Sequence, residues 1–289
     1  ILKEIKYVGS SKSSSSSKGK VDTSKPVPFK YEKDGEHSLT ILHTNDVHSH
    51  IQKIRGGKND GLGGIVERAT FIDSVRRADG RRNVLLLDAG DWDQGTSWFS
   101  VLRGKAEIEA MNIMRYDAAT IGNHEWDNGI DELAGRIGKA RFKTLLCNYN
   151  INDKKLNRYL KPYTIVRRGG KKIGIIGVLV NVATSVTHEV ASQLEYVRPD
   201  GPVNKWAKFL KEEKHCDLVI VLSHLGMTAY NTDLGDVEMV PNLRNVDLIV
   251  GGHSHTDQRE PKYVNDADGR PVLIVQDYCW GVYVGEIKL

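Results

Sequence analysis

Residues 247–256, DLIVGGHSHT, constrain the fold of this chain most strongly. A short apolar run stops at a Gly-Gly pair, and two histidines separated by one serine follow at once. This order is typical of a buried strand that ends in a metal-binding loop. His253 and His255 are therefore expected to leave one strand end together.

The same design recurs at other places in the chain, where an apolar run ends in acidic, amide or imidazole side chains. In open α/β sheets ligands bind outside the carboxyl ends of the strands, so these ends should converge on one crevice. That crevice is the predicted active site. The segments are TILHTNDVH with Asp46 and His48, NVLLLDAGD with Asp91, AATIGNHE with Asn123 and His124, and LVIVLSH with His224.

The formal net charge of +4 resides mostly at the N-terminus. Residues 1–38 contain eight lysines and five acidic residues, so the remainder is nearly neutral. A nearly neutral domain has no general footprint for a phosphate backbone, and a nucleic-acid polymer is not expected as a partner. No stretch is long and apolar enough to cross a membrane. The three cysteines, Cys147, Cys216 and Cys279, are expected to be buried thiols, because none forms a C-x-x-C pair.

Residues 1–38 differ in composition from the rest of the chain. They are rich in Ser, Lys and Pro and have few large apolar side chains, which predicts a flexible leader or tether, although residues 1–9 could form a short strand. This segment lacks the basic start and apolar core of a signal peptide. Either a targeting segment was removed before residue 1, or there never was one. Residues 39–289 are expected to form the catalytic domain.

Strand and helix patterns alternate in the first half of this domain. Helices are predicted at 64–80, 106–115, 129–141 and about 203–214, and the Gly-rich segment 54–64 is expected to be a mobile loop at the mouth of the site. Residues 163–180 predict a hairpin around a Gly-Gly turn. Together these patterns favour a layered α/β architecture with a pair of mixed sheets.

The predicted site has more imidazole and oxygen donors than one ion needs. Histidine with carboxylate, and without thiolate, suits Zn, Mn, Fe or Ni, and more than four ligands implies two ions. A carboxylate can bridge two ions, and Asp91 is the natural bridge. The remaining histidines, His37, His43, His50, His188 and His215, are expected at the surface or in the core.

The blocks TILHTNDVHSHI, GDWDQG, IGNHEWD, SHLG and GGHSHT resemble, in this order, the signature blocks of the calcineurin-like metallophosphoesterases. The TND-x-H and GNHE-aromatic-D blocks resemble the 5′-nucleotidase and UDP-sugar hydrolase branch. The resemblance covers residues 39–289 and implies a four-layer α/β/β/α sandwich. It implies one metal held by Asp46, His48, Asp91 and His255, and a second held by Asp91, Asn123, His224 and His253.

The resemblance gives His124 a different role from these ligands. His124, oriented by Asp127, would face the phosphate and stabilise charge or protonate the leaving oxygen, while Asn123 would bind a metal and orient the phosphate. Trp126 stands where the branch usually has Phe, and His255 where several nucleotidases have Gln or Asn. The sequence ends where that branch continues into a C-terminal domain that contacts the base, so a separate domain or chain is a possible partner.

The sequence thus predicts a phosphoesterase with two divalent ions, Zn, Mn or Fe, that hydrolyses phosphate monoesters, with nucleotides first, by a metal-bridging hydroxide. A phosphodiesterase acting on cyclic nucleotides or other diesters and a non-catalytic metal-stabilised binding module are the alternatives. By family resemblance the protein is expected in the periplasm, secreted or tethered to a surface. Trp92 and Trp98, beside the Asp91 loop, are expected to pack at the rim rather than to stack on a base.

Overall fold

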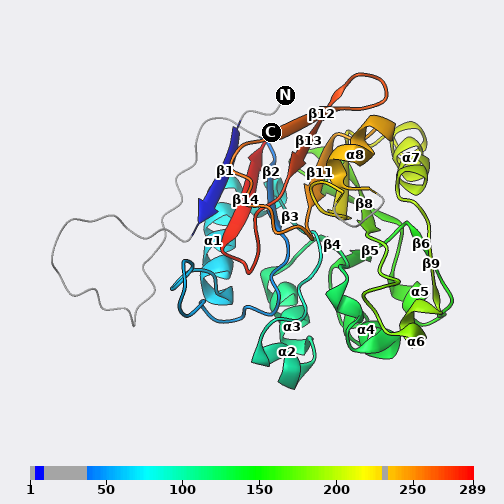
Figure 1. The fold of residues 1–289 in the computed structure, drawn as a ribbon. Coiled ribbons are helices and arrows are strands. Elements are labelled where there is room, and N and C mark those ends of the chain that lie inside the picture. The colour runs from blue at the N-terminus through cyan, green and yellow to red at the C-terminus, as the bar shows by residue number, and fades with distance from the viewer. Residues whose placement is uncertain (1–3, 10–37, 230–233) are drawn as a thin grey trace.

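The computed structural model describes residues 4–9, 38–229 and 234–289. Two six-stranded sheets form the centre of the fold (Figure 1). The first has the strand order β1 (Glu4–Gly9), β14 (Tyr283–Lys288), β2 (Thr40–Thr44), β3 (Val84–Asp88), β4 (Ala118–Thr120) and β5 (Lys143–Leu145). The second has the order β12 (Lys262–Asn265), β13 (Pro271–Val275), β11 (Leu248–Gly251), β10 (Leu218–His224), β8 (Lys171–Leu179) and β7 (Tyr163–Arg168). A small sheet pairs β6 (Tyr149–Ile151) with β9 (Leu194–Tyr196).

Alternate side chains of the strands belong to different apolar layers. In β2, Ile41 joins the cluster between the two sheets, whereas Leu42 packs into the cluster on the helical side. In β10, Leu222 and Val221 divide in the same way. Because successive side chains of a strand point to opposite faces, each sheet is covered on both faces. The predicted α/β/β/α sandwich of two mixed sheets is confirmed.

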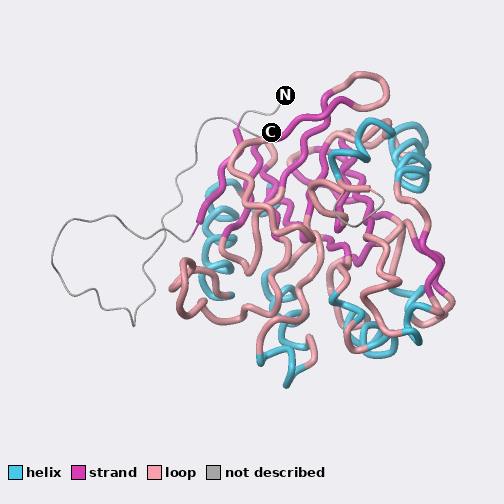
Figure 2. The backbone as a smooth tube through the Cα atoms, viewed as in Figure 1, coloured by secondary structure: helices cyan, strands magenta, loops and turns pink. Residues whose placement is uncertain are grey.

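Helices flank the sheets where the apolar periodicity predicts them (Figure 2). The helix predicted at 64–80 is α1 (Ile65–Asp79), and those at 106–115 and 129–141 are α3 (Lys105–Met114) and α4 (Gly129–Ile137). The fourth is α7 (Asp200–Lys208), which continues as a π-helical turn, Phe209–Glu213. Shorter helices are α2 (Ser97–Leu102), α5 (Leu156–Tyr159), α6 (His188–Ala191) and α8 (Asp236–Met239), and 3₁₀ turns are Arg81–Asn83, His124–Trp126 and Val240–Asn242.

The predicted hairpin is β7–β8, an antiparallel pair. Its turn residues Gly169 and Gly170 have φ angles of 56° and 72°, which glycine adopts at no steric cost. Beyond this hairpin, β8, β10, β11 and β13 are parallel neighbours, as are β2, β3, β4 and β5. Parallel strands end at one edge of a sheet, so the strand ends singled out in the sequence come together.

The short strand expected within residues 1–9 is β1, which pairs antiparallel with β14 at the edge of the first sheet. The rest of the predicted leader up to residue 37, including His37, lies outside the described residues. The three cysteines are free; Cys216 and Cys279 are buried and Cys147 is half-buried. No helix within the described ranges is both long enough and apolar enough to span a membrane.

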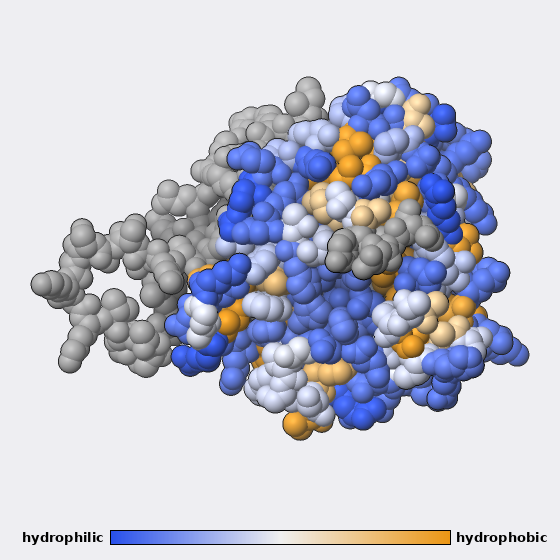
Figure 3. All heavy atoms as spheres, viewed as in Figure 1, coloured by the Kyte–Doolittle hydropathy of each residue, from blue (hydrophilic) through white to orange (hydrophobic). Residues whose placement is uncertain are grey.

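The face seen in Figure 3 is mostly hydrophilic, and its apolar patches are small and separate. The exposed apolar side chains include Trp98 and Val101, both on α2. Trp92, by contrast, is only 2% exposed and packs edge-on against Phe142. Trp92 is therefore core rather than rim, whereas Trp98 lies at the surface. Trp126 is also buried in the core.

Candidate metal centre

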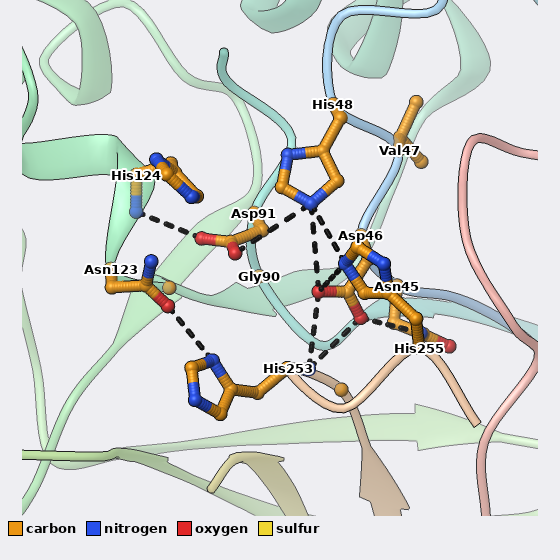
Figure 4. Close-up of polar contacts among 12 residues, drawn as sticks. Asn45, Asp46, Val47, His48, Gly90, Asp91, Asn123, His124, His253 and His255 are labelled. Atoms are coloured by element: carbon orange, nitrogen blue, oxygen red, sulfur yellow. Dashed lines mark hydrogen bonds and ion pairs between the residues drawn. The ribbon is translucent and has the colours of Figure 1, made fainter. Parts of the chain in front are cut away.

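Six of the side chains predicted at the strand ends line one cavity, namely His48, Asp91, Asn123, His124, His253 and His255 (Figure 4). Asp46 and His224 are fully buried and reach the same ligand groups from beneath its surface. Two of the loops that carry them are joined by their main chains. The N–H of Asp46 donates to the carbonyl of Gly90 at 2.9 Å, and the N–H of His48 donates to the carbonyl of Asp91 at 3.0 Å. The ends of β2 and β3 are thus held in register beyond the sheet, with Asp46, His48 and Asp91 beside one another.

Five of the predicted metal residues have a left-handed backbone. Positive φ angles are uncommon for residues other than glycine, and such conformations cluster at functional sites because the surrounding structure must enforce them. Here they let the chain turn sharply after each strand, which brings these side chains into the ligand groups. The residues, with φ between 48° and 75°, are Asp46, His48, Asp91, His253 and His255.

Asp46, His48 and His255 form the first group of side chains that could hold a metal ion. The Nε2 atoms of His48 and His255 lie 3.0 Å apart, and His255 Nε2 lies 3.3 Å from Asp46 Oδ1. Two imidazole nitrogens that face each other and a carboxylate oxygen need a shared proton or a cation between them. The donor set fits a divalent ion of the Zn, Mn or Fe type.

Asp91, His224 and His253 form the second group. His224 is fully buried, and its Nδ1 donates to the carbonyl of Ala89 at 2.7 Å. Its Nε2 has no hydrogen-bond partner of good geometry and lies 3.0 Å from Asp91 Oδ2. Metal-binding histidines usually donate their other ring N–H to a carbonyl, which leaves the facing nitrogen free to bind the ion. Asn123 lies beside this group, with its Oδ1 2.9 Å from His253 Nδ1.

Asp91 lies between the two groups. Its Oδ2 is 3.0 Å from His224 Nε2 and 3.9 Å from His48 Nε2, and its Oδ1 accepts the N–H of His124 at 2.9 Å. Gly122 makes this position possible, because a Cβ at Gly122 would lie 2.1 Å from Asp91 Oδ1. A bridging role for Asp91 is compatible with this geometry.

The shifts in pKa show that opposite charges in these groups stabilise one another against the cost of burial. Burial opposes ionisation of both Asp91 and His224, but their mutual attraction outweighs it: the pKa of the Asp91 carboxyl falls below its usual range and that of His224 rises to about 10. Burial also opposes protonation of His255, yet Asp46 raises its pKa to about 10. His253, half-buried and beside His224, has its pKa lowered to about 4 by desolvation and by His224. The buried carboxylates therefore require positive charge at this place.

His124 and Asp127 lie at the edge of the cavity. The ring Nδ1 of His124 and Asp127 Oδ2 are 2.9 Å apart, and this hydrogen bond raises the pKa of His124. A third group that could hold an ion contains His48, Asp91 and His124. Distance alone therefore does not separate His124 from the ligands, whereas its bond to a carboxylate gives it the orientation expected of an acid that faces a substrate.

The sequence prediction missed several residues of the site. His50, Gln94, Gly95 and Trp280 also line the cavity, which has a volume of about 470 Å³. His50 follows the first motif by two residues and was expected at the surface or in the core. Trp280 lies in the loop between β13 and β14 and is neither an acidic, an amide nor an imidazole residue, so the strand-end signal does not identify it.

The side-chain amide of Gln276 stabilises the loop that carries His253 and His255. Gln276 accepts the hydroxyl of Ser254 at 3.0 Å and the N–H of Thr256, and it donates to the Gly252 carbonyl at 2.9 Å. These contacts fix the GGHSHT loop from the end of β13. Because a glutamine has both donor and acceptor atoms, one side chain satisfies both kinds of main-chain group.

The other described histidines have different environments. His43 is fully buried within the first sheet, and burial lowers its pKa to about 3, so it is a neutral core residue. His188 begins α6 and His215 precedes β10; neither lines the cavity. No residue of the Gly-rich segment 54–64 lines the cavity, and Lys58 Nζ lies 5.2 Å from the ring centre of Tyr278.

Comparisons with known proteins identify the family of this chain. The family model for the calcineurin-like phosphoesterases matches residues 39–257. The chain is 34% identical to the snake venom 5′-nucleotidase of Naja atra over 278 residues, 88% of this chain and 50% of that protein. It is also 34% identical to the 5′-nucleotidase of Homo sapiens, covering 88% of this chain and 47% of that protein.

A solved structure has the same fold. The 5′-nucleotidase precursor of Thermus thermophilus superposes with a TM-score of 0.74 at 33% identity, covering 85% of this chain and 50% of that one. The chain thus spans about half the length of the relatives it matches. The family is one of metal-dependent hydrolases of phosphate esters, which is the chemistry expected of a cavity lined by imidazoles and carboxylates. The chain belongs to the calcineurin-like phosphoesterase family.

Proposed function

We propose that this chain is a phosphoesterase with two divalent metal ions that hydrolyses phosphate monoesters, and that nucleotides are among its substrates. The observation that carries the proposal is the position of Asp91 between two groups of ligands, each of which could hold an ion. The names of the relatives, 5′-nucleotidases at 34% identity, support a nucleotide substrate.

In this proposal Asp46, His48, Asp91 and His255 hold one ion, and Asp91, Asn123, His224 and His253 hold the other. Bound ions of this kind lower the pKa of a water molecule and neutralise charge on the transferred phosphoryl group. Zn, Mn and Fe are the proposed identities, because the donors are nitrogen and oxygen without sulfur. The fixed backbone of the loops holds the donors in place before an ion binds.

His124 is the proposed acid. Its hydrogen bond with Asp127 at 2.9 Å fixes the ring and favours the protonated form, which can stabilise the phosphoryl oxygens or give a proton to the leaving oxygen. Asn123 has a carboxamide that can bind an ion through oxygen and donate an N–H to the phosphate. The presence of His124 and Asp127 as an oriented pair favours catalysis over a non-catalytic binding module.

The proposed organisation is a leader, residues 1–38, whose strand β1 pairs with β14, and a catalytic domain, residues 39–289. The start of the family match at residue 39 supports this boundary. We also propose a location in the periplasm, outside the cell or on its surface, supported by relatives from snake venom. A separate domain or chain that contacts the substrate is a proposed partner, since the relatives are about twice as long as the match.

The test is reconstitution. Protein stripped with a chelator and reloaded with Zn, Mn or Fe should hold two ions by elemental analysis and release phosphate from nucleoside monophosphates. Faster cleavage of cyclic nucleotides would instead favour the phosphodiesterase alternative. Two bound ions without hydrolysis of any ester would indicate a binding module, and failure to bind ions would overturn the proposal.

A further inference from the structure

One residue that lines the cavity differs in polarity from the others. Most of its described lining consists of imidazole, carboxylate and carboxamide groups, as befits a site for ions and phosphate. Trp280 is the exception, because it alone among these lining residues carries a large, mainly apolar aromatic ring. The side chain is half-buried, so part of the indole remains accessible. An accessible indole in a polar cavity is a surface that planar apolar groups can cover.

Trp280 has an aromatic neighbour in the same wall. The rings of Trp280 and His50 are stacked, with centroids 5.2 Å apart and planes inclined by 23°. His50 Nδ1 donates to the carbonyl of His48 at 2.8 Å, which fixes the imidazole. We call His50 and Trp280 the aromatic platform. One side of the indole is therefore already supported, and the platform adjoins the first ligand group through His48.

The main chain around Trp280 is tied to the metal loop. The N–H of Trp280 donates to the carbonyl of Asp46 at 2.6 Å. Asn45 donates through Nδ2 to the carbonyl of Tyr278 at 2.7 Å and accepts the N–H of Asp277 at 2.9 Å. The indole is thus fixed relative to Asp46, rather than placed on a free loop.

The backbone of this segment is also unusual. Tyr278 and Trp280 have φ angles of 69° and 61°, in the left-handed region that non-glycine residues rarely occupy. The contacts with Asn45 and Asp46 maintain these conformations. Backbone conformations of this kind cluster at functional sites, where the surrounding structure maintains them. Here the backbone conformation fixes the position of the Trp280 side chain.

We infer that the aromatic platform binds an aromatic ring in the leaving group of the substrate, and so selects phosphate monoesters of aryl alcohols or nucleosides over those without a ring. This inference rests on the proposed phosphomonoesterase activity. The ions and His124 hold the phosphoryl group, whereas the platform contacts the non-reacting part. Binding energy from that part raises kcat/KM for substrates that reach it.

Stacking on an aromatic side chain tolerates any base, because every base has a π-face. The platform therefore distinguishes ring from no ring, but discriminates weakly among adenine, guanine and uracil. A single cavity can in this way prefer nucleotides without a pocket that reads the edge of the base.

The experiment compares Trp280→Ala with the unchanged protein on three substrates: adenosine 5′-monophosphate, ribose 5-phosphate and p-nitrophenyl phosphate. Ribose 5-phosphate is adenosine monophosphate without its base, so it isolates the contribution of the ring. We expect Trp280→Ala to lower kcat/KM about tenfold for at least one ring-bearing substrate, mainly through KM, and to leave ribose 5-phosphate within about twofold. If kcat/KM falls only for adenosine 5′-monophosphate, the platform binds the base. If kcat/KM falls only for p-nitrophenyl phosphate, the platform binds a ring that is attached directly to the phosphate.

Matched variants exclude a structural explanation. Trp280→Phe should keep the preference, and Trp98→Ala, which removes an exposed tryptophan of α2 outside the cavity lining, should change nothing. Metal content of Trp280→Ala should match the unchanged protein. An equal loss on ribose 5-phosphate, or no loss on either ring-bearing substrate, would overturn the inference. If the unchanged protein hydrolyses none of the three, it is the proposed function that fails.

Discussion

The buried carboxylate of Glu125 holds the main chain of Asp91 by a hydrogen bond: Glu125 Oε2 accepts the Asp91 N–H at 3.0 Å. The same carboxylate accepts the N–H of Asp93 at 3.0 Å through Oε1, and that of Gly122 through Oε2. Glu125 is fully buried, and burial, reinforced by Asp91, raises its pKa to about 7. One side chain thus sets the distance between the loop that carries Asp91 and the loop that carries Asn123.

Glu125→Gln should loosen this arrangement. The amide keeps one acceptor but places N–H donors opposite main-chain N–H groups, and leaving buried groups unpaired costs about 1–3 kcal/mol. We expect that loss in the free energy of urea unfolding, with metal affinity reduced about 10- to 100-fold, as for other groups that orient ligands. Glu132→Gln is the control, because Glu132 forms only a partly exposed ion pair with Arg103. Unchanged metal affinity in Glu125→Gln would show that Asp91 does not depend on this support.

Asp91→Asn should disturb both ions, whereas His255→Ala should weaken mainly one. The reason is that Asp91 Oδ2 faces both ligand groups, and His255 belongs to the first alone. Elemental analysis of purified variants after dialysis gives the stoichiometry. Should Asp91→Asn retain both ions with unchanged affinity, Asp91 is not the bridge.

His124→Ala should retain both ions and the fold, but lose about 10²–10⁴-fold in kcat, the range for a removed acid or charge stabiliser. Loss of an ion in this variant would instead make His124 a ligand, as its place in the third group with His48 and Asp91 allows.

Asp127→Ala should change the pH profile of kcat. The Asp127 hydrogen bond raises the pKa of His124, so the protonated ring persists to higher pH in the unchanged protein. Without Asp127 the pKa of His124 falls, and the loss of activity on the alkaline side should begin at lower pH. A profile identical to that of the unchanged protein would show that His124 is not the acid.

Asp236 should make the metal-free protein less stable as pH rises. Burial raises the pKa of Asp236 to about 8, and the hydrogen bond from Ser223 offsets this only in part. Between about pH 4 and pH 8 the unfolded chain therefore releases a proton that the folded chain keeps, and the free energy of unfolding falls by at most about 1.4 kcal/mol per pH unit.

Asp236→Asn cannot titrate and should lack this contribution. Relative to the unchanged protein, the variant should gain stability from pH 5 to pH 8 in urea unfolding with a chelator present. Asp131→Asn, at a side chain that is 94% exposed, is the control and should show no such gain. A constant difference between Asp236→Asn and the unchanged protein at both pH values would contradict the assigned burial effect.

The sequence by itself determined the layers of the fold and the chemical character of the site. Apolar runs that end in Asp46, Asp91, His224 or His253 specify both the buried strand and the residue that leaves it, because each signal lies within a few adjacent positions. Parallel strands then bring their ends to one edge as a matter of topology. The same local patterns predicted a layered architecture with a pair of mixed sheets, whereas the four-layer sandwich was implied by the family resemblance.

The tertiary structure alone decided what surrounds those residues. Asn45 donates a hydrogen bond to Tyr278, Trp280 stacks on His50, and Glu125 accepts the N–H of Asp91. These residues are far apart in the sequence, so no local pattern predicts the contacts. Likewise, His43 and His48 lie five positions apart, yet one is buried inside a sheet and the other faces the cavity. The side of a strand or loop that a residue occupies depends on the packing of distant segments, so the aromatic platform could be identified only in the folded chain.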